Sequence, residues 1–129
     1  MSIKSEYLLT YARSKVRVAR AQRPGDTLDQ VVRDHPILGF VPSVGEGWVH
    51  LIRAMCEHLA EHGLPDGLQV TDVKEKYGEL RAGTVPYFDD VDEIIETYVT
   101  VSREICDVCG EPGKLTGSRW VATRCEEHA

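Results

Sequence analysis

The sequence lacks any apolar run long enough to cross a membrane, and its N-terminal stretch lacks the apolar core of a signal peptide. We therefore expect a cytoplasmic protein with no membrane partner. Cysteine is also scarce, with four residues in 129, and only Cys56 lies outside the last twenty-four positions. Because Cys56 falls within an apolar pattern of helical spacing, it is expected to pack in the core.

Basic residues are fewer than acidic ones, which gives a net charge of −6. The basic residues are also unevenly distributed along the chain. Residues 1–23 hold six basic residues and one acidic residue, whereas residues 24–129 hold nine basic and twenty acidic ones. An acidic body of this kind repels nucleic acid in general. It suits a basic protein surface, or it serves only to keep the protein in solution.

The last twenty-four residues carry the clearest chemical pattern. Cys106, Cys109, Cys125 and His128 form C-x2-C-x15-C-x2-H, which has the residue types and pair spacing of a tetrahedral zinc site. Gly110 follows the second cysteine, where a chain that curls around an ion benefits from positive φ. A disulfide framework does not suit a reducing cytosol, and a redox CxxC would open a helix after a strand. The pattern predicts one structural Zn²⁺ with no open coordination position.

Apolar periodicity predicts an α+β fold of three helices, a β-hairpin and a C-terminal hairpin of the zinc-ribbon or zinc-knuckle kind. The helices are expected at 5–22, 46–62 and 90–105, and the β-hairpin at 68–86. Residues 27–42 offer a short helix followed by an extended apolar link. The chain is accordingly divided into an N-terminal basic helix and linker (1–43), an α+β body (44–105) and a zinc module docked on that body (106–129).

Three groups of basic or aromatic residues are candidates for partner binding. They are Arg13, Arg17 and Arg20 on one face of the first helix, Lys74, Lys76, Tyr77 and Arg81 near the hairpin tip, and Trp120 in the zinc module. The arginine face fits phosphate or an acidic partner, or it is solvated or docked on the chain's own acidic body. The hairpin tip fits a partner contact or protection of a strand edge. Trp120 fits stacking or an interface anchor, but covering the zinc site is the favoured interpretation, since so small a module has little other core.

A second metal pattern lies at the end of the 46–62 helix. His58, Glu61 and His62 match the H-x-x-E-H pattern of inverted zinc peptidases, in which two histidines share a metal and the glutamate is a base. The pattern is short, however, and histidines in a last helical turn are favoured by the helix dipole alone.

Four segments carry a resemblance to a known family. They are Gly45-Glu46-Gly47-Trp48-Val49-His50-Leu51-Ile52, Val73-Lys74-Glu75-Lys76-Tyr77-Gly78-Glu79-Leu80-Arg81, Cys106-Asp107-Val108-Cys109-Gly110-Glu111-Pro112-Gly113, and Trp120-Val121-Ala122-Thr123-Arg124-Cys125-Glu126-Glu127-His128-Ala129. Over residues 44–129 the chain resembles small uncharacterised proteins that are frequent in phage and prophage genomes. The resemblance implies no activity. It implies a setting in the cytoplasm of a bacterial host, where such proteins bind and redirect host machinery.

We expect a zinc-stabilised protein-binding module, an inhibitor of a host defence or nucleic-acid-processing complex of the anti-CRISPR type. Its partner would be a host protein or nucleoprotein complex. One alternative is a regulator that binds nucleic acid directly through the zinc ribbon and the basic helix, with Arg103, Lys114, Arg119 and Arg124 around Trp120. Asp107, Glu111, Glu126 and Glu127 in the same tail oppose it. The other alternative is a small metallohydrolase built on the H-x-x-E-H pattern.

Overall fold

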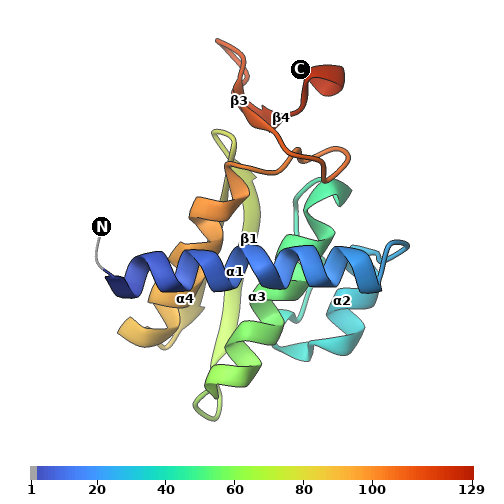
Figure 1. The fold of residues 1–129 in the computed structure, drawn as a ribbon. Helices are drawn as coiled ribbons and strands as arrows, with labels where there is room; N and C mark the ends of the chain where they lie inside the picture. Colours follow the sequence, from blue (N-terminus) through green and yellow to red (C-terminus); the bar gives the residue numbers. More distant parts are fainter. Residues whose placement is uncertain (1–2) are drawn as a thin grey trace.

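The long first helix crosses two others. In a computed structural model, which describes residues 3–129, α1 (Ile3–Gln22) lies across α3 (Val49–His62) and α4 (Asp89–Ser102) (Figure 1). Trp48, which directly precedes α3, and Leu51, Ile52, Met55 and Leu59 within it are buried, as the periodicity of residues 46–62 predicted. Apolar side chains of α4 and α1 meet it, so the core lies where the three helices converge.

The first β-hairpin packs on the side of the helices away from α1. Strands β1 (Gln69–Lys76) and β2 (Glu79–Val85) are antiparallel, and β2 packs on α4, where the Leu80 N–H donates to Ser102 Oγ at 3.0 Å. The turn between them holds Tyr77 and Gly78 at φ 55° and 81°. Positive φ at both central residues is typical of the tight turn whose twist matches that of the strands.

Residues 27–42, for which the sequence offered a short helix and an extended link, contain a further helix and a short turn. α2 (Leu28–Asp34) forms because Thr27 Oγ1 accepts a hydrogen bond from the Gln30 N–H at 3.1 Å. The next residues form the 3₁₀ turn η1 (Pro36–Leu38) and not an extended link, since a positive-φ glycine, Gly39, closes a turn there. Leu28, Val31 and Leu38 are buried in the same core as α3.

The two body helices are shorter than their apolar patterns suggested. Residues 46–48 form a 3₁₀ turn, η2 (Glu46–Trp48), before α3 begins at Val49. α4 ends at Ser102, and residues 103–105 are a turn, since Arg103, Glu104 and Ile105 donate to carbonyls three residues back. The apolar stripe continues through this turn, which is why periodicity alone extended the helix.

The C-terminal segment stands at one end of the helices (Figure 1). It contains β3 (Lys114–Thr116), antiparallel to β4 (Ala122–Arg124), and the 3₁₀ turn η3 (Glu126–His128). The α+β prediction is confirmed, with four α-helices, a β-hairpin and this smaller hairpin beside three cysteines and a histidine. Within residues 3–129 no helix combines the length and apolarity that crossing a membrane requires.

Candidate metal centre

Three cysteines and one histidine converge at the base of the β3–β4 hairpin. The Cys106, Cys109 and Cys125 sulfurs and a ring nitrogen of His128 all lie within 4.8 Å of one another. Cys106 is buried, Cys109 is exposed, and the other two are half-buried. Among residues 3–129 this is the one group of three or more metal-binding side chains that could hold an ion.

The spacing of the donor atoms fits a tetrahedral ion. Zinc–sulfur bonds of about 2.3 Å give sulfur–sulfur edges of about 3.8 Å, and zinc–nitrogen bonds of about 2.0–2.1 Å give mixed edges of about 3.6 Å. Cys109 Sγ lies 3.7 Å from Cys125 Sγ. His128 Nδ1 lies 3.7 Å from Cys106 Sγ and 3.1 Å from Cys125 Sγ. These separations, and the thiolate and imidazole donors themselves, are consistent with a zinc motif.

The electrostatics of the thiols also favour a cation. Burial raises the pKa of the Cys106 thiol, but backbone N–H groups of Cys125, Cys109 and Val108 outweigh it and lower that pKa to about 6. At Cys109 the Glu111 N–H lowers the pKa, yet burial and the neighbouring sulfurs raise it overall. One thiolate therefore forms readily, while a second meets its negative charge. A divalent cation between them would remove that repulsion.

The first ligand pair is held by a tight backbone turn. The Gly110 N–H donates to the Cys106 carbonyl at 2.9 Å, and the Cys106 N–H donates to the Glu111 carbonyl at 2.8 Å. Gly110 has φ 82°, so the predicted need for glycine after Cys109 is met. Both cysteine side chains thereby face one point from a single loop.

This loop is seated on the glycines that precede α3. The Gly47 N–H donates to the Asp107 carbonyl at 3.0 Å, and Trp48 Nε1 donates to the Ile105 carbonyl at 2.9 Å. A Cβ on Gly45 would lie 2.1 Å from the Asp107 carbonyl oxygen, and one on Gly47 would lie 2.4 Å from that of Cys106. The Gly45-x-Gly47-Trp48 segment is therefore the surface on which residues 106–111, called here the metal loop, pack. The helical pattern of the sequence marks this segment only as the start of a helix, although two glycines so close together are a signal of close backbone approach.

The tip of the first hairpin supports the second ligand segment. Thr123 is fully buried, and its Oγ1 donates to the Gly78 carbonyl at 2.6 Å. The Thr123 carbonyl in turn accepts from the Asp107 N–H at 3.0 Å, and Arg124 Nε donates to the Asp107 carboxylate at 3.0 Å. The two halves of the metal group are thus joined to each other and to the β1–β2 turn.

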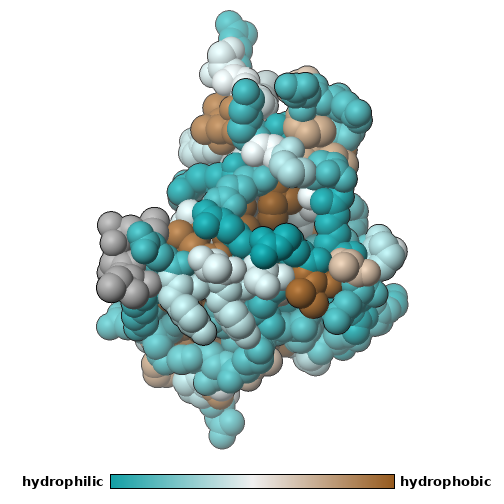
Figure 2. Space-filling model, in the orientation of Figure 1, coloured by the Kyte–Doolittle hydropathy of each residue, from teal (hydrophilic) through white to brown (hydrophobic). Residues whose placement is uncertain are grey.

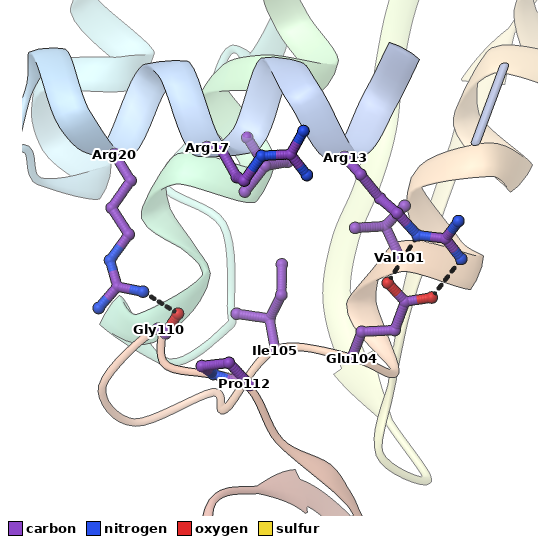
Figure 3. Close-up of a pocket in the computed structure, with 9 residues that line it drawn as sticks. Arg13, Arg17, Arg20, Val101, Glu104, Ile105, Gly110 and Pro112 are labelled. Carbon is purple, nitrogen blue, oxygen red and sulfur yellow. Dashed lines mark hydrogen bonds and ion pairs between the residues drawn. The ribbon is translucent and has the colours of Figure 1, made fainter. Parts of the chain in front are cut away.

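The predicted arginine face of α1 is divided by its contacts. Arg13 forms two hydrogen bonds to the Glu104 carboxylate, at 2.9 and 2.7 Å. Arg20 donates to the Gly110 carbonyl at 2.8 Å (Figure 3). It also donates to Glu111 Oε1 at 2.7 Å. Arg17, between them, is exposed and has no hydrogen bond or ion pair within residues 3–129. Two of the three arginines are therefore docked on the chain's own acidic groups.

The residues of the hairpin-tip set have different surroundings. Arg81 pairs with Glu79 at 3.0 Å, and Lys74 lies 3.9 Å from Asp72. Lys76 lies 5.6 Å above the Tyr77 ring, and that ring is 70% exposed. Lys76 and Tyr77 thus remain available at the turn, whereas the other two cations are partly neutralised by neighbours.

Trp120 does not cover the metal group, contrary to the favoured interpretation. Its side chain is 91% exposed, near the turn of the β3–β4 hairpin and away from the ligands at its base. The turn is tight at Gly117, because a Cβ there would lie 2.2 Å from the Trp120 carbonyl oxygen. The buried Cys106, Asp107 and Thr123 line the inside of the module instead.

The H-x-x-E-H residues have separate partners. His58 is buried, and its Nδ1 lies 2.9 Å from Tyr98 Oη, while His62 Nε2 lies 2.7 Å from an Asp90 carboxylate oxygen. Glu61 accepts hydrogen bonds from Tyr11 and Lys15, and the Lys15 bond lowers its pKa. Burial also lowers the pKa of His58. Each side chain is used to join helices, and the two histidines do not converge on one point.

Arg53, in the middle of the apolar α3 pattern, is a buried residue that sequence analysis passed over. It is 2% exposed and binds the Asp26 carboxylate at 2.5 and 3.0 Å and Asp34 at 2.9 Å. Burial raises the pKa of Asp26, but the hydrogen bonds and the charge of Arg53 lower it, so that the pKa is below its usual value. An arginine within a buried stripe signals such acidic partners, because an unpaired buried charge is very costly.

Neither the protein-family models nor the curated proteins nor the solved structures contain a match to this chain.

Proposed function

We propose that this chain is a zinc-stabilised protein-binding module with one structural Zn²⁺ held by Cys106, Cys109, Cys125 and His128. Four protein ligands complete a tetrahedron and leave no position for a substrate. The ion would instead close the β3–β4 hairpin and fix it against the body, because the ligand loop is seated on Gly45 and Gly47. A hairpin fixed in this way presents its outer side chains at little cost in conformational entropy.

The observation that carries the proposal is the exposure of Trp120. Tryptophan has the largest apolar side chain, and the other tryptophan of the chain, Trp48, is completely buried. Leu115 on β3 is 55% exposed. Its Cδ1 packs so closely on Gly78 that a Cβ there would lie 2.4 Å away, and Gly78 directly follows the exposed Tyr77. Exposed aromatic residues on a rigid element are typical anchors of protein interfaces. The proposed binding surface, called here the hairpin surface, comprises Tyr77, Leu115 and Trp120.

The setting of this module rests on the sequence resemblance to small phage and prophage proteins. In that setting the partner would be a host protein or nucleoprotein complex, and the module would inhibit host defence or nucleic-acid processing in the bacterial cytoplasm. The net charge of −6 is compatible with a basic partner surface.

Direct nucleic-acid binding is the second candidate, and one observation favours it. Lys76, Lys114 and Arg119 have no ion-pair partner in the described part of the chain, and they directly precede the exposed Tyr77, Leu115 and Trp120 in sequence. Cations beside aromatic rings form a surface for the backbone and bases of a single strand. The same three residues would serve an acidic protein equally well.

Two variants separate the hairpin surface from the rest of the molecule. Trp120→Ala removes the anchor, and Tyr7→Ala removes an exposed aromatic side chain on α1, which is 69% exposed. Zinc-loaded forms of both and of the wild type would be immobilised and exposed to bacterial cytosol, and retained proteins identified by mass spectrometry. We expect a specific partner to be retained by wild type and Tyr7→Ala and lost with Trp120→Ala. Equal retention by all three would contradict the proposal.

The nucleic-acid candidate is tested with the same proteins. Fluorescence anisotropy with single-stranded oligonucleotides would be measured between about 50 and 200 mM salt. Binding that persists at the higher salt and is lost in Trp120→Ala would establish the second candidate in place of the first.

A further inference from the structure

A small pocket lies between α1 and the metal loop. Figure 2 shows a hollow with hydrophobic residues at its floor where α1 passes below the C-terminal module, with hydrophilic residues around it. Its apolar lining, called here the floor, comes from Val16 of α1, Val101 of α4, Ile105 and Pro112, and the volume is about 200 Å³. The charged residues that line it, called here the rim, are Arg13, Arg17 and Arg20 of α1 and Glu104.

The charge at the rim is uneven in a way that selects a ligand. Arg13 and Arg20 are engaged by Glu104 and Glu111, so each contributes to a neutral pair. Arg17 lies between them on α1, where its guanidinium lies alongside the helix, and it has no such partner within residues 3–129 (Figure 3). The pocket therefore has one uncompensated positive charge, and its guanidinium has the planar fork that matches a carboxylate.

The apolar floor and the size set the rest of the ligand. The volume of about 200 Å³ is below that of pockets for drug-sized molecules, so the pocket suits a small ligand. Inorganic phosphate would leave the apolar floor in contact with water, because it has no apolar group to cover that floor.

We propose that this pocket binds an aliphatic monocarboxylate, with the carboxylate on Arg17 and a branched chain on Ile105 and its apolar neighbours. This is a site separate from the hairpin surface and independent of the function proposed for it. A free short-chain acid and the last residue of a peptide ending in leucine present the same atoms, so the experiment treats them as two sources of one ligand.

The test uses the zinc-loaded protein labelled with ¹⁵N and four probes. They are 4-methylpentanoate, the neutral 4-methylpentanamide, the peptide Gly-Gly-Leu and its C-terminal amide. We expect at least one of the two carboxylates to shift the amide signals of Ile105 and Gly110 with a dissociation constant on the order of 1 mM, typical of so small a ligand. Binding by the free acid alone assigns a small-molecule ligand, and binding by the peptide alone assigns a chain terminus.

Arg17→Gln is the decisive variant, and Arg33→Gln is its matched control, since Arg33 is an exposed arginine on α2. We expect Arg17→Gln to weaken carboxylate binding roughly tenfold, because a charge-assisted paired hydrogen bond is lost. Arg33→Gln should leave the affinity unchanged, and both variants should keep the wild-type spectrum in the absence of ligand. No binding by either carboxylate, equal binding by the neutral amides, or unchanged affinity in Arg17→Gln would overturn the proposal.

Discussion

Gly47→Ala should detach the metal loop from the body. The new Cβ would lie 2.4 Å from the Cys106 carbonyl oxygen, 2.6 Å from the Asp107 carbonyl carbon and 2.7 Å from the Cys109 nitrogen. All three are backbone atoms, so no flexible side chain can move aside. Overpacking of this kind costs about 1–3 kcal/mol. The hydrogen bond from the Gly47 N–H to Asp107 would also be lost, at a further cost of about 1 kcal/mol.

We therefore expect the free energy of unfolding of the zinc-loaded protein to fall by about 2–4 kcal/mol. Urea denaturation followed by circular dichroism measures it directly. Gly25→Ala is the control, because a Cβ there meets nothing within 4 Å. It should change stability by less than about 1 kcal/mol, in the stabilising direction. If Gly47→Ala proves as stable as Gly25→Ala, the seating of the metal loop on this glycine is wrong.

Three further predictions concern single side chains. Asp26→Asn should cost about 3 kcal/mol at pH 7, because it breaks the buried pair with Arg53. Because the pKa of Asp26 is lowered in the folded state, its contribution to the free energy of unfolding is complete above its unfolded-state pKa near 4. That contribution is lost as the pH falls through the lower folded-state pKa. Urea titrations at pH 7 and at about pH 2 should therefore show a smaller stability difference between wild type and variant in acid. Cys109→Ser should lower the zinc content, while His58→Ala should keep one zinc per chain; metal analysis showing the reverse pattern would mean that the ligands are misassigned. Burial raises the pKa of Cys56 to about 12, so mass spectrometry after iodoacetamide treatment of the zinc-loaded protein at pH 8 should find this thiol unmodified, and rapid labelling would show that the core around it opens.

Elements with a strong period were predictable from sequence. The buried stripes of α3 and α4 repeat at helical spacing, and the metal ligands are recognisable because a few residue types at short spacing are required by the ion. Helix ends were less predictable. The apolar stripe of α4 continues to Ile105, although the chain leaves the helix after Ser102. Periodicity reports which side chains face the core, not which backbone hydrogen bonds are made.

Features that depend on contacts between residues far apart in the chain could not be predicted from the sequence. Nothing local to Arg13 and Arg20 shows that Glu104 and Glu111 neutralise them, because about ninety residues separate each pair. Trp120 was expected to cover the metal group, since small modules need core. It is 91% exposed instead, and residue type alone does not determine which way a side chain next to a turn points.

The buried pairing of Arg53 restricts how this sequence can vary among relatives. Asp26 comes from the turn after α1 and Asp34 from the end of α2, so one arginine serves two separate segments. Replacing Arg53 alone would leave two carboxylates without a counter-charge, one of them almost fully buried. Substitutions at these three positions should therefore occur together in evolution, with an apolar residue at 53 accompanied by uncharged residues at 26 and 34.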